Sequence, residues 1–256
     1  IEAIRTGGGR RLDFGVANET AWEVGLSCGG QIAVLVSPIG SAGINPKILA
    51  GIVVELQARR SVTICMSAAS GMLQVPLLPV MPEISCFDEA SDMFYLVQPP
   101  ARRLLIIGAV HITQFLAPMA KLAGYDVTII DPRDAYTTAE RFPGIDRFTV
   151  WPDEAMRTLI PDARTAIVTL THDPKIDDPG LQAALLSDAY YIACLGSRRT
   201  HAARCKRMQK LCFDADDLRR LKGPAGLNIG ALTPSEIAVS ILAEMIAVER
   251  MPEPGQ

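Results

Sequence analysis

The stretch LLIIGAVHITQFL, at residues 104–116, constrains the fold of this chain more than any other. An apolar strand runs into Gly108 and a helix follows, which is how a nucleotide-binding α/β fold opens. A dinucleotide fingerprint reads G-x-G-x-x-G, but only its first glycine is present, and Val110 stands where the second would let a pyrophosphate approach. The stretch therefore predicts a strand–turn–helix unit without fixing its ligand.

The rest of the C-terminal part repeats this pattern of strand and helix. Four further runs are short, nearly continuously apolar and rich in β-branched or aromatic residues, at 126–131, 147–151, 165–171 and 190–196. Such runs are typical of strands that are buried on both faces of a parallel sheet. The last long helix begins at TPSE, where Thr233 is the expected N-cap, Pro234 the first helical residue and Glu236 the partner in a capping box.

A different pattern precedes the proline- and arginine-rich segment LVQPPARR at residues 96–103. Strands are predicted at 31–37 and 61–67, with a helix at 45–60 between them and a further strand at 72–77. We therefore expect an α/β protein with two domains, a small α+β unit over residues 1–97 and a domain with a mainly parallel sheet over residues 98–256.

Charge and cysteine content exclude several classes of function. The net charge of −3 gives no general attraction to nucleic acid or to anionic membranes. No run approaches the roughly 18 apolar residues that cross a bilayer. The six cysteines form no C-x-x-C pair, and no secretory signal is visible. The sequence therefore predicts reduced thiols and a cytoplasmic protein, with neither a nucleic-acid partner nor a membrane span.

Polar residues follow the ends of the predicted parallel strands, where ligands bind in such sheets. Asp131 lies 23 positions after Gly108, which roughly matches the spacing of the acid that bonds a nucleotide ribose. Arg198 and Arg199 supply planar donors that suit phosphate. The other candidate ligand-binding residues at these strand ends are His111, Arg133, His172, Gly196 and Ser197.

The N-terminal unit contributes one further candidate, Cys28, which is followed by Gly29 and Gly30. Exposed N–H groups beside a thiol lower its pKa or bind an oxyanion. The alternative is a buried cysteine next to a tight turn, which spacing alone favours.

Three stretches together resemble the XdhC/CoxI family, the accessory proteins of xanthine dehydrogenase and related molybdenum hydroxylases. They are TAWEVGLSCGG, LGSRRT and GPAGLNIGALTPSEIAVSILAEMIAVER, and the resemblance covers most of the chain from Gly15 onward. It implies a Rossmann-like C-terminal domain and a non-catalytic chaperone that binds the molybdenum cofactor (molybdopterin) as cargo. Such a chaperone helps to insert the cofactor, in sulfurated form, into a xanthine dehydrogenase-type molybdenum hydroxylase. A cysteine desulfurase is a candidate second partner, and a homodimer is compatible with the sequence.

The resemblance also carries over individual residues as cofactor-binding candidates. Cys28 and its two glycines match the C-G-G segment of the family, and Gly196–Arg199 match its G-S-R-R turn. The usual G-A-G-H turn reads Gly108, Ala109, Val110 and His111 here, and Asp131 matches the strand-end acid. Family members usually carry an upstream S-G-G-C segment, which we expect this chain to lack, since only TGGGRR stands near its first residue.

Other functions remain open on the residues alone. An NAD(P)-dependent oxidoreductase would use the same crevice, with His111 or His172 as the acid–base group. A metal site built from histidines with Cys194 or Cys205 has no ligand-spacing motif behind it. Because the resemblance implies a chaperone, we assign no catalytic residue.

Overall fold

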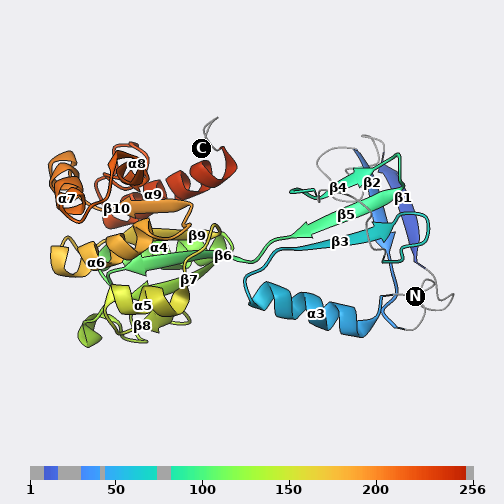
Figure 1. Cartoon of the computed structure of the whole chain (residues 1–256), viewed down its shortest axis with the longest axis horizontal. Coiled ribbons are helices and arrows are strands. Elements are labelled where there is room, and N and C mark those ends of the chain that lie inside the picture. Colours follow the sequence, from blue (N-terminus) through green and yellow to red (C-terminus); the bar gives the residue numbers. More distant parts are fainter. Residues whose placement is uncertain (1–8, 17–29, 41–43, 74–81, 252–256) are drawn as a thin grey trace. The chain divides into compact units, whose positions relative to one another are not determined.

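The structure is a computed structural model that describes residues 9–16, 30–40, 44–73 and 82–251. The chain divides into two compact units, Ile1–Pro100 and Ala101–Gln256. Figure 1 shows the first unit in blue to turquoise and the second in green to red.

Two small antiparallel sheets and one helix make up the described part of the N-terminal unit. Strand β1 (Arg10–Val16) pairs with β2 (Gly30–Val36), and β5 (Met93–Gln98) lies between β3 (Val62–Ser67) and β4 (Cys86–Asp88). Helix α3 (Pro46–Gln57) starts with an N-cap, Asn45, whose side chain accepts a hydrogen bond from the Lys47 N–H. The predicted strands at 31–37 and 61–67 and the helix at 45–60 are therefore confirmed within a few residues.

The sequence did not predict β1, β4 and β5. Strand β1 reads RRLDFGV, which alternates too irregularly to be recognised as a strand, and β4 has only three residues. Strand β5 ends at Gln98, directly before the two prolines, so its last residues lie in the segment at 96–103 that we interpreted as a break. Of the strand predicted at 72–77, Leu73 forms an isolated bridge with Met66, and the residues after it lie outside the described ranges.

Six parallel strands form the sheet of the C-terminal unit. They are β6 (Arg102–Ile107), β7 (Tyr125–Ile130), β8 (Asp146–Phe148), β9 (Thr165–Thr169), β10 (Tyr191–Cys194) and β11 (Leu221–Lys222). Their spatial order is β11-β10-β9-β6-β7-β8, and every pair is parallel. Counted from β6, this is the 3-2-1-4-5-6 order of Rossmann folds, read from its other end. The predicted fold class is confirmed.

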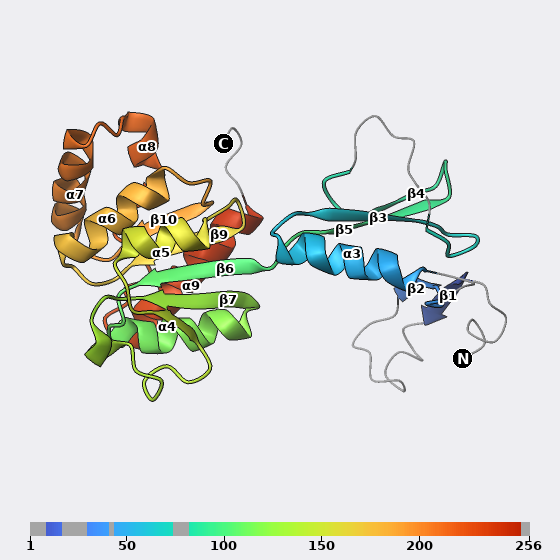
Figure 2. The same ribbon diagram turned by 60° about the horizontal axis from the view of Figure 1, so that its bottom comes forward.

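The last four residues of the central strand β6, Leu104–Ile107, are continuously apolar because both of their faces are buried. Leu104 and Ile106 point into one core, and Leu105 and Ile107 point into the other, and all four are 0% exposed. Helices α4 (His111–Leu122) and α9 (Pro234–Arg250) cover the first face, while α5 (Pro152–Leu159) and α6 (Pro174–Leu185) cover the second (Figure 2). Burial on both faces favours apolar residues at successive positions of a strand.

The third strand of this unit is shorter than predicted, whereas the predicted start of its last helix is confirmed. The third strand ends at Phe148 rather than 151, because Trp151 is already the N-cap of α5 and Pro152 its first residue. The capping box of α9 is present: Thr233 accepts from the Glu236 N–H, and Glu236 accepts from the Thr233 N–H. Within the described residues, no helix combines the length and the apolar character needed to cross a membrane.

Candidate functional site

The carboxyl ends of four neighbouring strands, β7, β6, β9 and β10, meet at one edge of the sheet. The chain leaves β6 toward β7 on one side, and β9 lies on the other, so the strand order reverses between β6 and β9. Ligands of open parallel sheets bind in the crevice at such a point. The strand ends are held level by backbone hydrogen bonds, since the Gly108 N–H donates to the Ile130 carbonyl at 2.8 Å and the Leu170 N–H to the Ile107 carbonyl at 2.9 Å.

Gly108 forms the turn between β6 and α4 at the centre of this edge. Its φ of +110° is a conformation that L side chains rarely adopt, and a Cβ here would lie 2.6 Å from Cγ2 of Thr171. The Gly108 carbonyl accepts a hydrogen bond of 2.5 Å from the buried Thr113 hydroxyl. Val110, at the second fingerprint position, is the N-cap of α4 and packs against the apolar core. Core packing therefore accounts for the residue that replaces the glycine.

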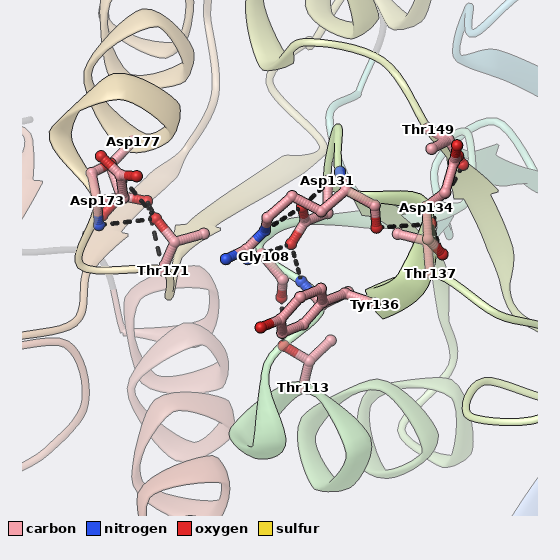
Figure 3. A network of polar contacts seen from close by, with 12 residues as sticks. Gly108, Thr113, Asp131, Asp134, Tyr136, Thr137, Thr149, Thr171, Asp173 and Asp177 are labelled. Carbon is pink, nitrogen blue, oxygen red and sulfur yellow. Dashed lines mark hydrogen bonds and ion pairs between the residues drawn. The ribbon is translucent and has the colours of Figure 1, made fainter.

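Asp131, at the end of β7, is 0% exposed and accepts four hydrogen bonds (Figure 3). One carboxylate oxygen accepts from the Ala109 N–H at 2.8 Å and from Nη2 of Arg133 at 2.6 Å. The other accepts from the backbone N–H of Arg133 at 3.0 Å and from its Nε at 2.8 Å. Burial raises the pKa of Asp131, but these donors outweigh burial and hold the pKa below its usual value. The carboxylate is therefore ionised and ties the turn after β6 to the end of β7.

Arg133 covers this buried carboxylate with a side chain that is 36% exposed. Its guanidinium carbon lies 4.3 Å from the centre of the Tyr136 ring, in the short helix η2 (Asp134–Tyr136). The charge of Asp173, from the loop after β9, also raises the pKa of Arg133, although less than Asp131 does. Arg133, on the loop after β7, therefore also interacts electrostatically with the loop after β9.

The loop after β9 is linked to helix α7 (Arg198–Lys210) through Asp177 of helix α6, which forms a buried ion pair with Arg204 of α7. The Thr171 hydroxyl donates to Asp177 at 2.7 Å, and Asp177 lies 3.6 Å from Nη2 of Arg204. Both charged residues are 1% exposed, and Nη2 also donates to the Leu195 carbonyl at 3.1 Å. Nε and Nη1 of Arg204 have no hydrogen-bond partner among the described residues. Burial raises the pKa of Asp177, despite Thr171 and Arg204.

The turn between β10 and α7 presents a helix N-terminus with two exposed arginines. Gly196 has a φ of +134°, and the Ser197 side chain caps the helix by accepting from the Thr200 N–H. Arg198 and Arg199 are exposed, and neither makes an ion pair with another residue of the described ranges. The N–H groups of a helix N-terminus and planar guanidinium donors suit a phosphate.

The residues that the sequence singled out fall into three groups. Those on the strand-end loops of the C-terminal unit lie along the one edge; they are Gly108, His111, Asp131, Arg133, His172, Gly196, Ser197, Arg198 and Arg199. Gly30 begins β2 in the other unit, and Cys28 and Gly29 lie outside the described residues. His111, the first residue of α4, and His172, in the loop after β9, are both exposed.

Sequence reasoning missed Thr171, Asp177 and Arg204, which join the loops of the edge. Asp177 and Arg204 stand inside helices, where a charged residue usually faces water, so their spacing carried no signal. No group of three or more metal-ligating side chains occurs in the part of the chain that the structure describes. Burial raises the pKa of the Cys194 thiol to about 12, so it is a neutral core residue.

A cavity of about 910 Å³ lies at the opposite edge of the sheet, beside the start of β9, β10 and β11. Tyr191 donates to Glu244 at 2.5 Å in its lining, and Arg164 lies 3.1 Å from Glu249, although Nε of Arg164 has no hydrogen-bond partner among the described residues. The cavity does not lie at the carboxyl ends of the strands, where ligands of parallel sheets bind, so the carboxyl edge is the candidate site.

A family model described as the XdhC Rossmann domain matches residues 104–245, which include every loop of this edge. The chain belongs to the XdhC family. The match spans more than half of the chain and confirms the family that the sequence motifs resemble.

Two curated relatives extend the comparison of this XdhC family member. The chain is 31% identical to a probable xanthine dehydrogenase subunit of Bacillus subtilis over 165 residues, which are 64% of this chain and 48% of that protein. It is 26% identical to the molybdenum cofactor insertion chaperone PaoD of Escherichia coli over 248 residues, 97% of this chain and 69% of PaoD. The chain thus spans about half of the first relative and about two thirds of the second.

A solved structure supports the fold of both units. A Bacillus halodurans protein described as a xanthine dehydrogenase superposes with a TM-score of 0.72 at 23% identity. The superposition covers 98% of this chain and 78% of that protein. At this identity the likeness concerns the fold alone.

Proposed function

We propose that this chain binds the molybdenum cofactor and helps to insert it, in sulfurated form, into a xanthine dehydrogenase or a related molybdenum hydroxylase. The observation that carries the proposal is the match to a molybdenum cofactor insertion chaperone over 97% of the chain. A cysteine desulfurase as sulfur donor, and self-association as a homodimer, belong to the same proposal.

The carboxyl edge has the groups that such a cargo needs. The cofactor combines a pterin, a phosphate and a metal, so its recognition requires a crevice and anion donors. The helix N-terminus at Ser197 and the exposed guanidinium groups of Arg198 and Arg199 supply the donors. A carrier has no need for nicotinamide chemistry, which is consistent with a core valine at position 110.

The direct test is an anaerobic titration of the full chain with freshly released molybdenum cofactor, for wild type and Cys28→Ser. We expect the wild-type chain to bind with near-stoichiometric occupancy and Cys28→Ser to bind less tightly, since the family resemblance places Cys28 in the cofactor site. Absence of binding to the wild-type chain would contradict the proposed function. Equal binding by both proteins would remove Cys28 from the site and leave the function standing.

The combined substitution of Arg198→Ala and Arg199→Ala is expected to weaken cofactor binding by about 2 kcal/mol, or about 30-fold in Kd. The reason is the loss of charge-assisted hydrogen bonds to the phosphate. The matched control is Lys206→Ala with Lys210→Ala, which removes the same charge from the exposed surface farther along the helix. Similar affinities of the two double variants would argue against a phosphate site at this turn.

The alternative function is an NAD(P)-dependent oxidoreductase, and the Rossmann-like strand order is the observation in its favour. It requires that a reduced nicotinamide dinucleotide bind and raise the melting temperature. The same titration with NADH and NADPH distinguishes the two functions.

A further inference from the structure

In sheets of this strand order, the acid at the end of the second strand accepts hydrogen bonds from ribose hydroxyls. Asp131 stands at that position, but both of its carboxylate oxygens already accept two hydrogen bonds each. With 0% of its surface exposed, it has no oxygen left for a ribose. Two of the four donors, Nε and Nη2, belong to the Arg133 side chain, one on each carboxylate oxygen, so this side chain decides whether the acid can accept from a ligand.

The group that faces solvent at this position is the Arg133 guanidinium. Nε and Nη2 are directed to Asp131, whereas Nη1 makes no hydrogen bond with any residue in the described ranges. The Tyr136 ring, whose centre lies 4.3 Å from the guanidinium carbon, supports the guanidinium through a cation–π contact. Because this support fixes the direction of the remaining N–H groups, it favours recognition of a planar or tetrahedral anion.

We propose that Arg133 determines the ligand specificity of the crevice, by donating to a phosphate of the bound cofactor and by withholding Asp131 from the ribose of a nicotinamide dinucleotide. The phosphate contact rests on the proposed function, because the cargo supplies the phosphate. The exclusion of the ribose rests only on the hydrogen bonds of Asp131.

Val110 is a second residue that disfavours a nicotinamide dinucleotide. Val110 fills the position of the glycine that would let a pyrophosphate approach the turn, and its side chain packs against the core. A test of Arg133 alone could be masked by this valine. The experiment therefore compares Arg133→Ala in the wild-type background and in a Val110→Gly background.

The probe is NADH, titrated against the full chain with fluorescence or calorimetric detection. We expect Arg133→Ala to increase NADH affinity at least 10-fold in the Val110→Gly background, because each carboxylate oxygen of Asp131 loses one of its two hydrogen bonds and can accept one from the ribose. The matched control is Arg141→Ala, because Arg141 lies 5.7 Å from the same Tyr136 ring and does not bond Asp131. Unchanged NADH affinity on loss of Arg133 in both backgrounds would overturn the exclusion.

The second measurement uses the molybdenum cofactor itself. Arg133→Ala is expected to weaken its binding at least 10-fold relative to wild type and to Arg141→Ala. Equal binding would overturn the phosphate contact. If the cofactor fails to bind the wild-type chain, the proposed function fails, whereas a gain of NADH affinity in the variant would still support the exclusion. Arg133→Gln, which keeps one donor for Asp131, replaces the alanine variant if circular dichroism shows that the latter does not fold.

Discussion

Arg204→Ala is expected to lower the free energy of unfolding by about 3 kcal/mol. The substitution leaves Asp177, which is 1% exposed, without its cation. Removing one partner of a buried ion pair costs about 3–5 kcal/mol, because the remaining charge stays out of water. The lower end applies here, since two nitrogens of Arg204 have no partner among the described residues and are removed with the side chain.

Urea unfolding followed by far-UV circular dichroism measures this loss. Arg207→Ala is the matched control, because Arg207 stands on the same helix and pairs with Asp178, but its side chain is 35% exposed. We expect the control to cost at most about 1 kcal/mol. If the two substitutions cost the same, the Arg204–Asp177 pair does not stabilise the fold as a buried charge pair.

The pH dependence gives a further check of the same cause. Burial raises the pKa of Asp177 in the folded chain, and loss of Arg204 raises it further. A buried carboxyl group destabilises the folded chain less when it is protonated, so the deficit of Arg204→Ala is largest at pH values above the raised pKa of Asp177. It is expected to shrink as the pH falls through the raised pKa of Asp177.

Gly108→Ala is also expected to cost about 3 kcal/mol of stability, and to weaken cofactor binding with it. A φ of +110° strains any L side chain by roughly 1–2 kcal/mol. The new Cβ would also lie 2.6 Å from Cγ2 of Thr171, and overpacking of this kind costs roughly 1–3 kcal/mol. Thermal and urea unfolding measure the sum.

Two companion variants separate strain from crowding. Gly144 has a φ of +67°, and a Cβ there would meet only the end of Lys121, 3.7 Å away, so we expect Gly144→Ala to cost only about 1 kcal/mol. Thr171→Ser removes Cγ2 but keeps the hydroxyl that bonds Asp177, and in the Gly108→Ala background it is expected to restore about 1 kcal/mol. No recovery would show that crowding by Thr171 is not part of the cost.

Periodicity and capping rules predicted the parts of the fold that depend on local sequence. Five of the six strands of the parallel sheet could be located because burial on both faces favours apolar residues at successive positions, as at Leu104–Ile107. Strand β11, which has only two residues, was not predicted. Strands β1 and β4 could not be located, because β1 alternates irregularly and β4 is short, and their pairing depends on partners far along the chain.

Spacing located candidate residues on the strand-end loops but not their hydrogen-bond partners. It placed Asp131 at the ribose position, yet only the three-dimensional structure shows that Arg133, two residues later, occupies its oxygens. Likewise, nothing in the sequence distinguishes Arg204, which is buried, from Arg207 on the next turn, which is partly exposed.

The Thr171–Asp177–Arg204 contacts have a consequence for mutational surveys of this chain. They connect the loop after β9 to the turn after β10, and Thr171 also abuts the turn after β6. A survey scored by the proposed binding of the cofactor would therefore give interior positions of helix α7 the same severe scores as the exposed arginines at its start. If the amount of folded protein were also measured for each variant, residues that maintain the structure of the crevice could be distinguished from residues that contact a bound ligand.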